Sequence, residues 1–158
     1  MKRTAPGQLV LLAAVGGASL WLVEAALTST GRAIVVPPFA LAFVLALMGV
    51  IVVALAWPVR KVTRGEEGAH VDPFYATRVV MLAKASSLSG ALLAGAALGI
   101  AGYLLSRSIP PIGSLTMALT AAVGAGLLLA GGLVAEHMCS LPPDDDEPSI
   151  AEGAEGAT

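Results

Sequence analysis

Four long stretches without a charged residue dominate this sequence of 158 residues. They are Thr4–Val23, Ala33–Val59, Ala85–Ser106 and Ser108–Ala135, with 20, 27, 22 and 28 residues. An α-helix needs about 20 mainly apolar residues to cross the hydrocarbon core of a bilayer. Charged residues make up only 13% of the chain, against about 25% in a typical soluble domain. The sequence therefore predicts an all-α, polytopic transmembrane bundle of four helices and excludes an ordinary soluble domain.

Prolines and one capping residue indicate where these helices begin and end. We expect helices over residues 8–26, 39–59, 76–105 and 115–138, within a transmembrane domain of residues 1–141. Pro58 can end or kink the second helix, while Asp72 can cap the third helix with Pro73 at its first position. Residues 142–158 are acidic and rich in Gly and Ala, so they are expected to form a disordered cytoplasmic tail.

The distribution of Lys and Arg predicts the orientation, because cytoplasmic loops carry an excess of both. Two of them, Arg32 and Arg107, fall on one side of the predicted bundle. Seven fall on the other side, namely Lys2, Arg3, Arg60, Lys61, Arg64, Arg78 and Lys84. This pattern predicts a multi-pass protein of the cytoplasmic membrane with both termini in the cytoplasm.

The first segment has a second interpretation, a cleaved secretory signal peptide. Lys2 and Arg3 precede an apolar stretch from Leu9 to Val23, and the small residues Ala25 and Ala26 follow it. Glu24 is an awkward neighbour for a cleavage site. Cleavage would leave three helices in the same orientation, so only the number of helices depends on it.

Small residues at four-residue spacing indicate how the third and fourth helices pack, because close approach of helices in lipid requires small side chains. A short loop joins the two helices, so they must run antiparallel as a hairpin. Matching depths across this hairpin places Gly95 opposite residues 125–126. The two ridges expected to meet are Ser87, Ala91, Gly95 and Gly99 on the third helix and Ala118, Ala122, Gly126 and Ala130 on the fourth.

Three ionisable residues lie near the predicted membrane boundaries, where such groups are functional candidates by default. Lys84 and Glu136 each lie 21 positions from the opposite end of their helix, which places them at the same depth. They are candidates for a structural ion pair, and the alternative is that each side chain extends to the interface. For Glu24 we expect a contact with Arg32 or simple solvation.

The sequence offers little that could carry enzymatic chemistry. It contains one cysteine, Cys139, and two histidines, too few for a zinc module. Neighbouring residues in the run Glu136–Cys139 point around a helix and cannot converge on one ion. A net charge of −2 gives no basic field for nucleic acid. We therefore expect no catalytic residues, no cofactor and no bound metal.

Several short motifs together resemble a family of small actinobacterial membrane proteins of unknown function. They are Val36-Pro37-Pro38, the segment Ala54–Arg60, Asp72-Pro73-Phe74 with Arg78, the segment Leu82–Ser86, and Ala135–Cys139 followed by Leu141–Asp145. The resemblance covers about residues 4–147. It implies a genetic setting beside folate-biosynthesis genes, and it implies no activity, ligand or catalytic residue.

Two functions from different classes are compatible with these features. The first is a non-enzymatic accessory or interaction protein, whose partners are the lipid bilayer and another membrane protein. The second is a small transporter or channel component for a small metabolite, expected as a homo-oligomer, and the implied folate setting suggests a pterin-related solute. Transport would require a polar cavity at mid-depth, where the available hydroxyls are Ser86, Ser87, Ser89 and Thr120.

Overall fold

A computed structural model describes residues 6–64, 72–107 and 112–139. It contains four α-helices: α1 over Pro6–Ser29, α2 over Phe39–Thr63, α3 over Pro73–Leu105 and α4 over Ile112–Cys139. All four are long and apolar enough to cross a membrane. The predicted all-α fold with four membrane-length helices is confirmed. The basic start of the chain, His70 and the acidic tail lie outside the described residues.

The helices are longer than the sequence predicted, most clearly at the end of α2. This helix passes through Pro58 and ends at Thr63, whereas we expected it to end near residue 59. Proline removes one backbone donor, but the surrounding turns are held by their own hydrogen bonds and by packing of Val59. At the start of α3, the predicted cap is present, and the helix begins at Pro73, before the predicted boundary at residue 76. The Asp72 side chain accepts a hydrogen bond from the Phe74 N–H at 2.9 Å, and Pro73 occupies the first helical turn.

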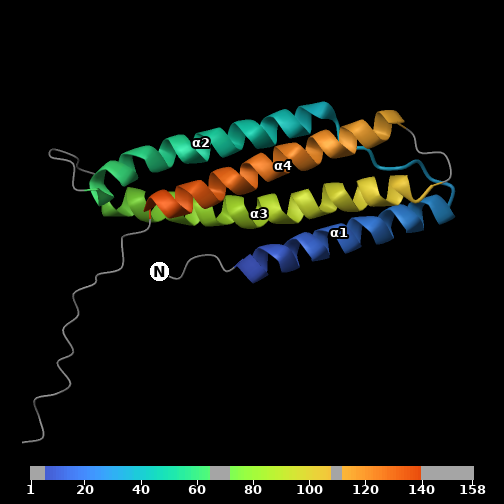
Figure 1. The fold of residues 1–158 in the computed structure, drawn as a ribbon, viewed down its shortest axis with the longest axis horizontal. Helices are drawn as coiled ribbons and strands as arrows, with labels where there is room; N and C mark the ends of the chain where they lie inside the picture. Colours follow the sequence, from blue (N-terminus) through green and yellow to red (C-terminus); the bar gives the residue numbers. More distant parts are fainter. Residues whose placement is uncertain (1–5, 65–71, 108–111, 140–158) are drawn as a thin grey trace, which may run out of the picture.

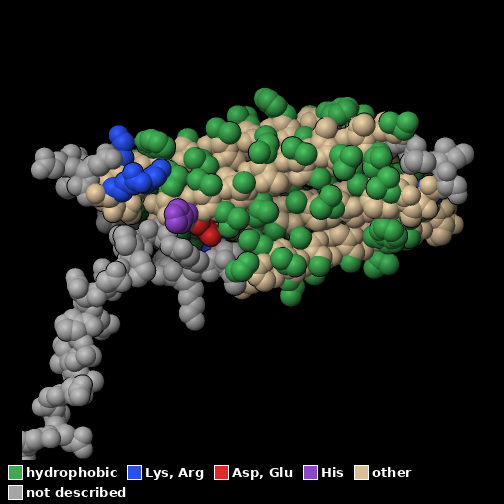
Figure 2. Space-filling model, viewed as in Figure 1, with side chains coloured by type: hydrophobic (Ala, Val, Ile, Leu, Met, Phe, Trp, Pro, Cys, Tyr) green, Lys and Arg blue, Asp and Glu red, His purple; other side chains and the backbone are tan. Residues whose placement is uncertain are grey.

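The helices form a curved layer in the spatial order α1, α3, α4, α2 (Figure 1). Among the described residues, α1 packs against α3 and against no other helix, whereas α2 packs mainly on α4. We call the end that holds the C-terminus of α2 the Arg60 end, and the opposite end the Tyr103 end. Apolar side chains cover the outer surface of the layer (Figure 2), as expected for helices that face lipid.

Glycines allow the neighbouring helices with parallel directions to touch through their backbones. A methyl group on Gly95 would overlap the backbone of Ala13, and one on Gly99 would overlap Gly17. On the other side of the layer, a methyl group on Gly131 would lie 2.8 Å from the carbonyl oxygen of Gly49. These contacts all join residues 82 positions apart in the sequence, so α1 on α3 and α2 on α4 share the same register.

The antiparallel hairpin of α3 and α4 is present at the depth that the sequence predicted. Gly132 packs on Ala83 and Ser87, and Gly90 packs on Ala125 and Leu129. Ala118 is fully buried beside Ile100, Ala101 and Leu104.

The assignment of Gly95, Gly99, Gly126 and Ala130 to this hairpin is wrong, whereas that of Ala91 and Ala122 stays a prediction. Gly95 and Gly99 face α1, Gly126 has no neighbour within 4 Å of an added methyl group, and Ala130 is exposed. Because α3 lies between two helices, it needs two small-residue faces. The single ridge predicted on this helix combined residues from both faces.

Two apolar clusters hold the ends of the layer together. At the Arg60 end, Val52, Ala56 and Val59 of α2 pack with residues of α3 and α4, including Ala83 and Ala135. At the Tyr103 end, the cluster around Leu104 also receives Leu20 of α1 and Ile34 of the α1–α2 connection. The core is therefore built from different sets of three helices at its two ends.

Candidate functional site

The least expected side chain in the structure is Glu24, a carboxylate with no solvent-exposed surface on α1. Its Oε1 accepts a hydrogen bond from the backbone N–H of Val35 at 3.0 Å. Its Oε2 is buried and has no hydrogen-bond partner. The expectation that Glu24 is solvated or bound to Arg32 is wrong. Glu24 is buried, Arg32 is exposed, and the backbone N–H of Val35 donates to the carboxylate instead.

A left-handed glycine explains how Val35 returns to Glu24. Gly31 has a φ of 70°, a conformation that glycine adopts without steric cost. The Arg32 N–H then donates to the carbonyl of Leu27 at 2.9 Å, which ends α1 in the manner of a Schellman motif. The chain reverses, and the extended segment after it runs back across the end of the layer (Figure 1).

One turn after Glu24, a chain of polar contacts joins α1 to α3. The Thr28 hydroxyl donates to the carbonyl oxygen of Glu24 at 2.7 Å, so its hydrogen bond with the Tyr103 hydroxyl has Tyr103 as the donor. Arg107 donates to the Tyr103 hydroxyl at 3.3 Å, and its guanidinium carbon lies 5.6 Å from the ring centroid. Trp21 meets the same ring edge-to-face at 5.8 Å. This cluster fixes the relative position of the two helices at the Tyr103 end.

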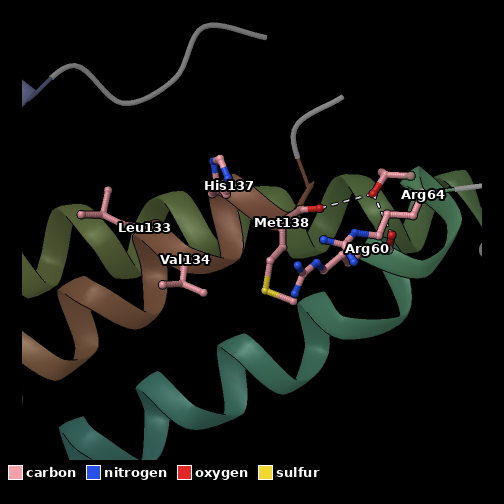
Figure 3. Close-up of a pocket in the computed structure, with 7 residues that line it drawn as sticks. Arg60, Arg64, Leu133, Val134, His137 and Met138 are labelled. Atoms are coloured by element: carbon pink, nitrogen blue, oxygen red, sulfur yellow. Dashed lines mark hydrogen bonds between the residues drawn. The ribbon is translucent and has the colours of Figure 1, made fainter. Parts of the chain in front are cut away.

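A second candidate site is a hollow of about 530 Å³ at the Arg60 end, between the last turns of α2 and α4. Its basic and polar wall consists of Arg60 and Thr63 from α2, the capping residue Arg64, and His137 from α4 (Figure 3). The Thr63 hydroxyl donates to the carbonyl of Arg60 at 2.9 Å and approaches the carbonyl of Met138 at 3.4 Å. These contacts connect the two walls of the hollow.

Lys84 and Glu136 lie on the neighbouring helices α3 and α4, as predicted. The residues beside them, Ala83 and Ala135, belong to one buried cluster, which places both residues toward the Arg60 end. The ion pair between the two side chains stays a prediction. Both residues are half-buried.

Of the four hydroxyls that a mid-depth cavity would need, three donate to carbonyl oxygens of their own helices. The Ser87 hydroxyl donates to the carbonyl of Lys84 at 2.9 Å, and that of Thr120 donates to Met117 at 2.9 Å. Ser89 reaches the carbonyl of Ser86 at 3.3 Å.

In the run Glu136–Cys139, which we expect to hold no metal, Met138 is buried while His137 is exposed. Within the part of the chain that the structure describes, His, Cys, Asp and Glu form no group of three suited to a metal ion.

Sequence reasoning missed the hollow at the Arg60 end and the partner of Glu24. The four-residue spacing of Arg60 and Arg64 was visible, but the predicted helix ended at residue 59, whereas α2 continues to Thr63 and brings both arginines beside α4. The position of Gly31 between Glu24 and Val35 was the signal for a chain reversal. Neither feature involves a known catalytic motif, so motif searches could not find them.

Comparison with known proteins places all four helices in one family. The family model matches residues 9–143, a span that begins in α1 and extends beyond α4. No curated protein and no solved structure matches the chain. The chain belongs to the family described as "Protein of unknown function (DUF3180)".

Proposed function

We propose that this chain is a multi-pass protein of the cytoplasmic membrane that acts without catalysis, by binding another membrane protein. The observation that carries this proposal is the open face of α4 around Gly126. A methyl group on Gly126 would have no neighbour within 4 Å, and Ala130, one turn further along, is exposed. At the other glycines in the middle of α4, Gly124, Gly131 and Gly132, backbone atoms of α2 or α3 occupy the space beside the glycine. Small residues permit close helix contact in lipid, and this set is available to a helix from outside the chain.

The orientation belongs to the same proposal. Arg60, Lys61, Arg64 and Arg78 lie at the Arg60 end, while Arg32 and Arg107 lie at the Tyr103 end. The positive-inside rule then supports a cytoplasmic Arg60 end, with both termini on that side. The packing of α1 on α3, together with a family match that begins in α1, favours retention of α1 in the mature protein over its removal as a signal peptide.

Crosslinking in the native membrane tests the proposal. The tagged chain is crosslinked in its host, and the proteins that co-purify are identified by mass spectrometry. We expect a stoichiometric membrane-protein partner that is lost with Gly126→Leu. Gly113→Leu is the matched control, because a methyl group at Gly113 also meets nothing within 4 Å and this residue lies at the start of α4. Equal recovery of the partner with both variants would contradict the assignment of this face.

The alternative function, a small transporter or channel component for a pterin-related solute, rests on the actinobacterial, folate-associated setting that the resemblance implies. It receives less support from the side chains. Ser87, Ser89 and Thr120 direct their hydroxyls to carbonyls of their own helices. Recovery of self-crosslinks alone would favour this alternative through a homo-oligomer.

A further inference from the structure

Basic side chains dominate the polar lining of the hollow at the Arg60 end. Arg60 lies in the last turn of α2 and Arg64 caps the end of that helix, and none of the seven residues that line the hollow is acidic. Like charges at i, i+4 on a helix repel each other. An anion placed between the two guanidinium groups would remove this repulsion.

The basic side chains are those suited to a phosphate group. Guanidinium groups bind phosphate oxygens through two parallel hydrogen bonds, and their charge persists at any physiological pH. Arg60 is half-buried and its guanidinium carbon lies 6.0 Å from the Trp57 ring centroid, which restricts its position at the edge of the hollow. Arg64, directly after α2, and His137 of α4 also line the hollow, and both side chains are exposed.

The remaining wall of the hollow is apolar. Leu133 and Val134 line it from α4 and are exposed, while Met138 is buried at its base. Leu133 lies one helical turn from His137, toward the middle of the layer. In a membrane, this wall would lie on the hydrocarbon side of the basic groups. The hollow therefore offers an anion site that continues directly into an apolar surface.

We propose that this hollow binds one anionic glycerophospholipid, with its phosphate between Arg60 and Arg64 and an acyl chain along Leu133 and Val134. The apolar wall selects a lipid over a free phosphate, which shares the same anionic chemistry. The proposal rests on the membrane location in the proposed function, and it does not depend on a protein partner.

Lipid titration of the purified full-length chain in nonionic detergent tests the site. Phosphatidylglycerol and phosphatidylcholine with identical acyl chains are added in parallel, and inorganic phosphate is the third arm. The readouts are the midpoint of thermal unfolding and the lipid retained in native mass spectrometry. We expect phosphatidylglycerol to raise the midpoint and to stay bound at one copy per chain, while phosphatidylcholine and inorganic phosphate have no such effect.

Variants distinguish the hollow from general surface charge. Arg60→Gln and Arg64→Gln are each expected to weaken phosphatidylglycerol binding about fivefold, the usual value for one cation near an anionic lipid. The controls Lys61→Gln and Arg78→Gln remove exposed cations at the same end but outside the lining, and should bind as the wild type does. Unfolding without lipid shows that each variant is folded, and Arg60→Lys should restore part of the affinity if Arg60→Gln is unstable.

Three results would overturn the proposal. Equal weakening by the control variants would assign the effect to surface charge. Protection by inorganic phosphate alone would assign the hollow to a soluble anion. Equal binding of both lipids, which each carry a phosphate, would exclude a site selective for the net negative charge of the lipid. All of these results are independent of the crosslinking experiment, so failure of the lipid site and failure of the proposed partner can be distinguished.

Discussion

At the scale of single residues, Glu24 has the most demanding environment in the part of the chain that the structure describes. A buried carboxylate is costly unless hydrogen bonds compensate for the lost water. Here one oxygen receives the Val35 N–H and the other receives none. This hydrogen bond ties the α1–α2 connection at Val35 to α1 at Glu24.

Substitution of Glu24 separates the hydrogen bond from the charge. Glu24→Gln keeps a carbonyl oxygen for the Val35 N–H and is expected to preserve or raise the free energy of unfolding. Glu24→Ala removes the acceptor and should lower it by about 1 kcal/mol, the usual net contribution of one hydrogen bond. Thermal unfolding in detergent measures both. Equal destabilisation by Gln and Ala would show that the negative charge, and not the hydrogen bond, is what the fold requires.

The sequence revealed Glu24 as an unusual residue but could not predict its environment. Its position near a helix end is equally compatible with solvent and with burial. The outcome depends on where the chain goes after Gly31, and that path is set by the packing of Ile34 against the cluster at the Tyr103 end. Contacts between residues on separate elements carry no local signal in one sequence.

At the scale of helices, the length and apolar character of each segment were predictable because a span of lipid imposes both. The cap at Asp72 was predictable because it involves neighbours in sequence. The partner of each small-residue face was not. With 18 glycines in the chain, several four-residue ridges exist on each helix, and only the packed structure shows that Gly95 contacts α1 while Gly90 contacts α4.

Substitution of single glycines by alanine tests these helix contacts. Gly95→Ala places a methyl group into the backbone of Ala13 and should cost about 1–3 kcal/mol of stability, as overpacking does. Gly102→Ala meets only a ring carbon of Trp21 at 3.2 Å and should cost less. Gly126→Ala meets nothing and should be neutral or stabilising, because alanine favours helix.

The midpoint of thermal unfolding in detergent ranks the three variants. The expected order of stability is Gly126→Ala, then Gly102→Ala, then Gly95→Ala. If Gly126→Ala destabilised the monomer as much as Gly95→Ala does, the open face of α4 would have to be packed within the chain.

At the scale of the whole molecule, the fold is a layer in which α1 has one neighbour. The two parallel pairs are each joined by backbone contacts at glycine, and the central hairpin joins the pairs. This arrangement leaves wide apolar surfaces on α1, α2 and α4. In a membrane such surfaces face lipid or another protein, which agrees with a chain that works by association.

The positions of the basic residues give the whole molecule a predicted direction in the membrane. The Arg60 end carries the arginines of the proposed lipid site, so that site would draw its ligand from the cytoplasmic leaflet. The Tyr103 end carries Arg32 and Arg107, both exposed. Cysteine labelling can report the two ends separately because Cys139 is the single cysteine.

The most direct test of the account is therefore labelling of intact cells with a membrane-impermeant maleimide. The wild-type chain carries Cys139 at the Arg60 end, while Arg32→Cys and Arg107→Cys in a Cys139→Ser background report the Tyr103 end. We predict that both engineered cysteines are labelled in intact cells and that Cys139 is labelled only after the cells are permeabilised. Labelling of Cys139 in intact cells, with protection of the other two, would contradict the orientation and place the Arg60 end outside the cytoplasm.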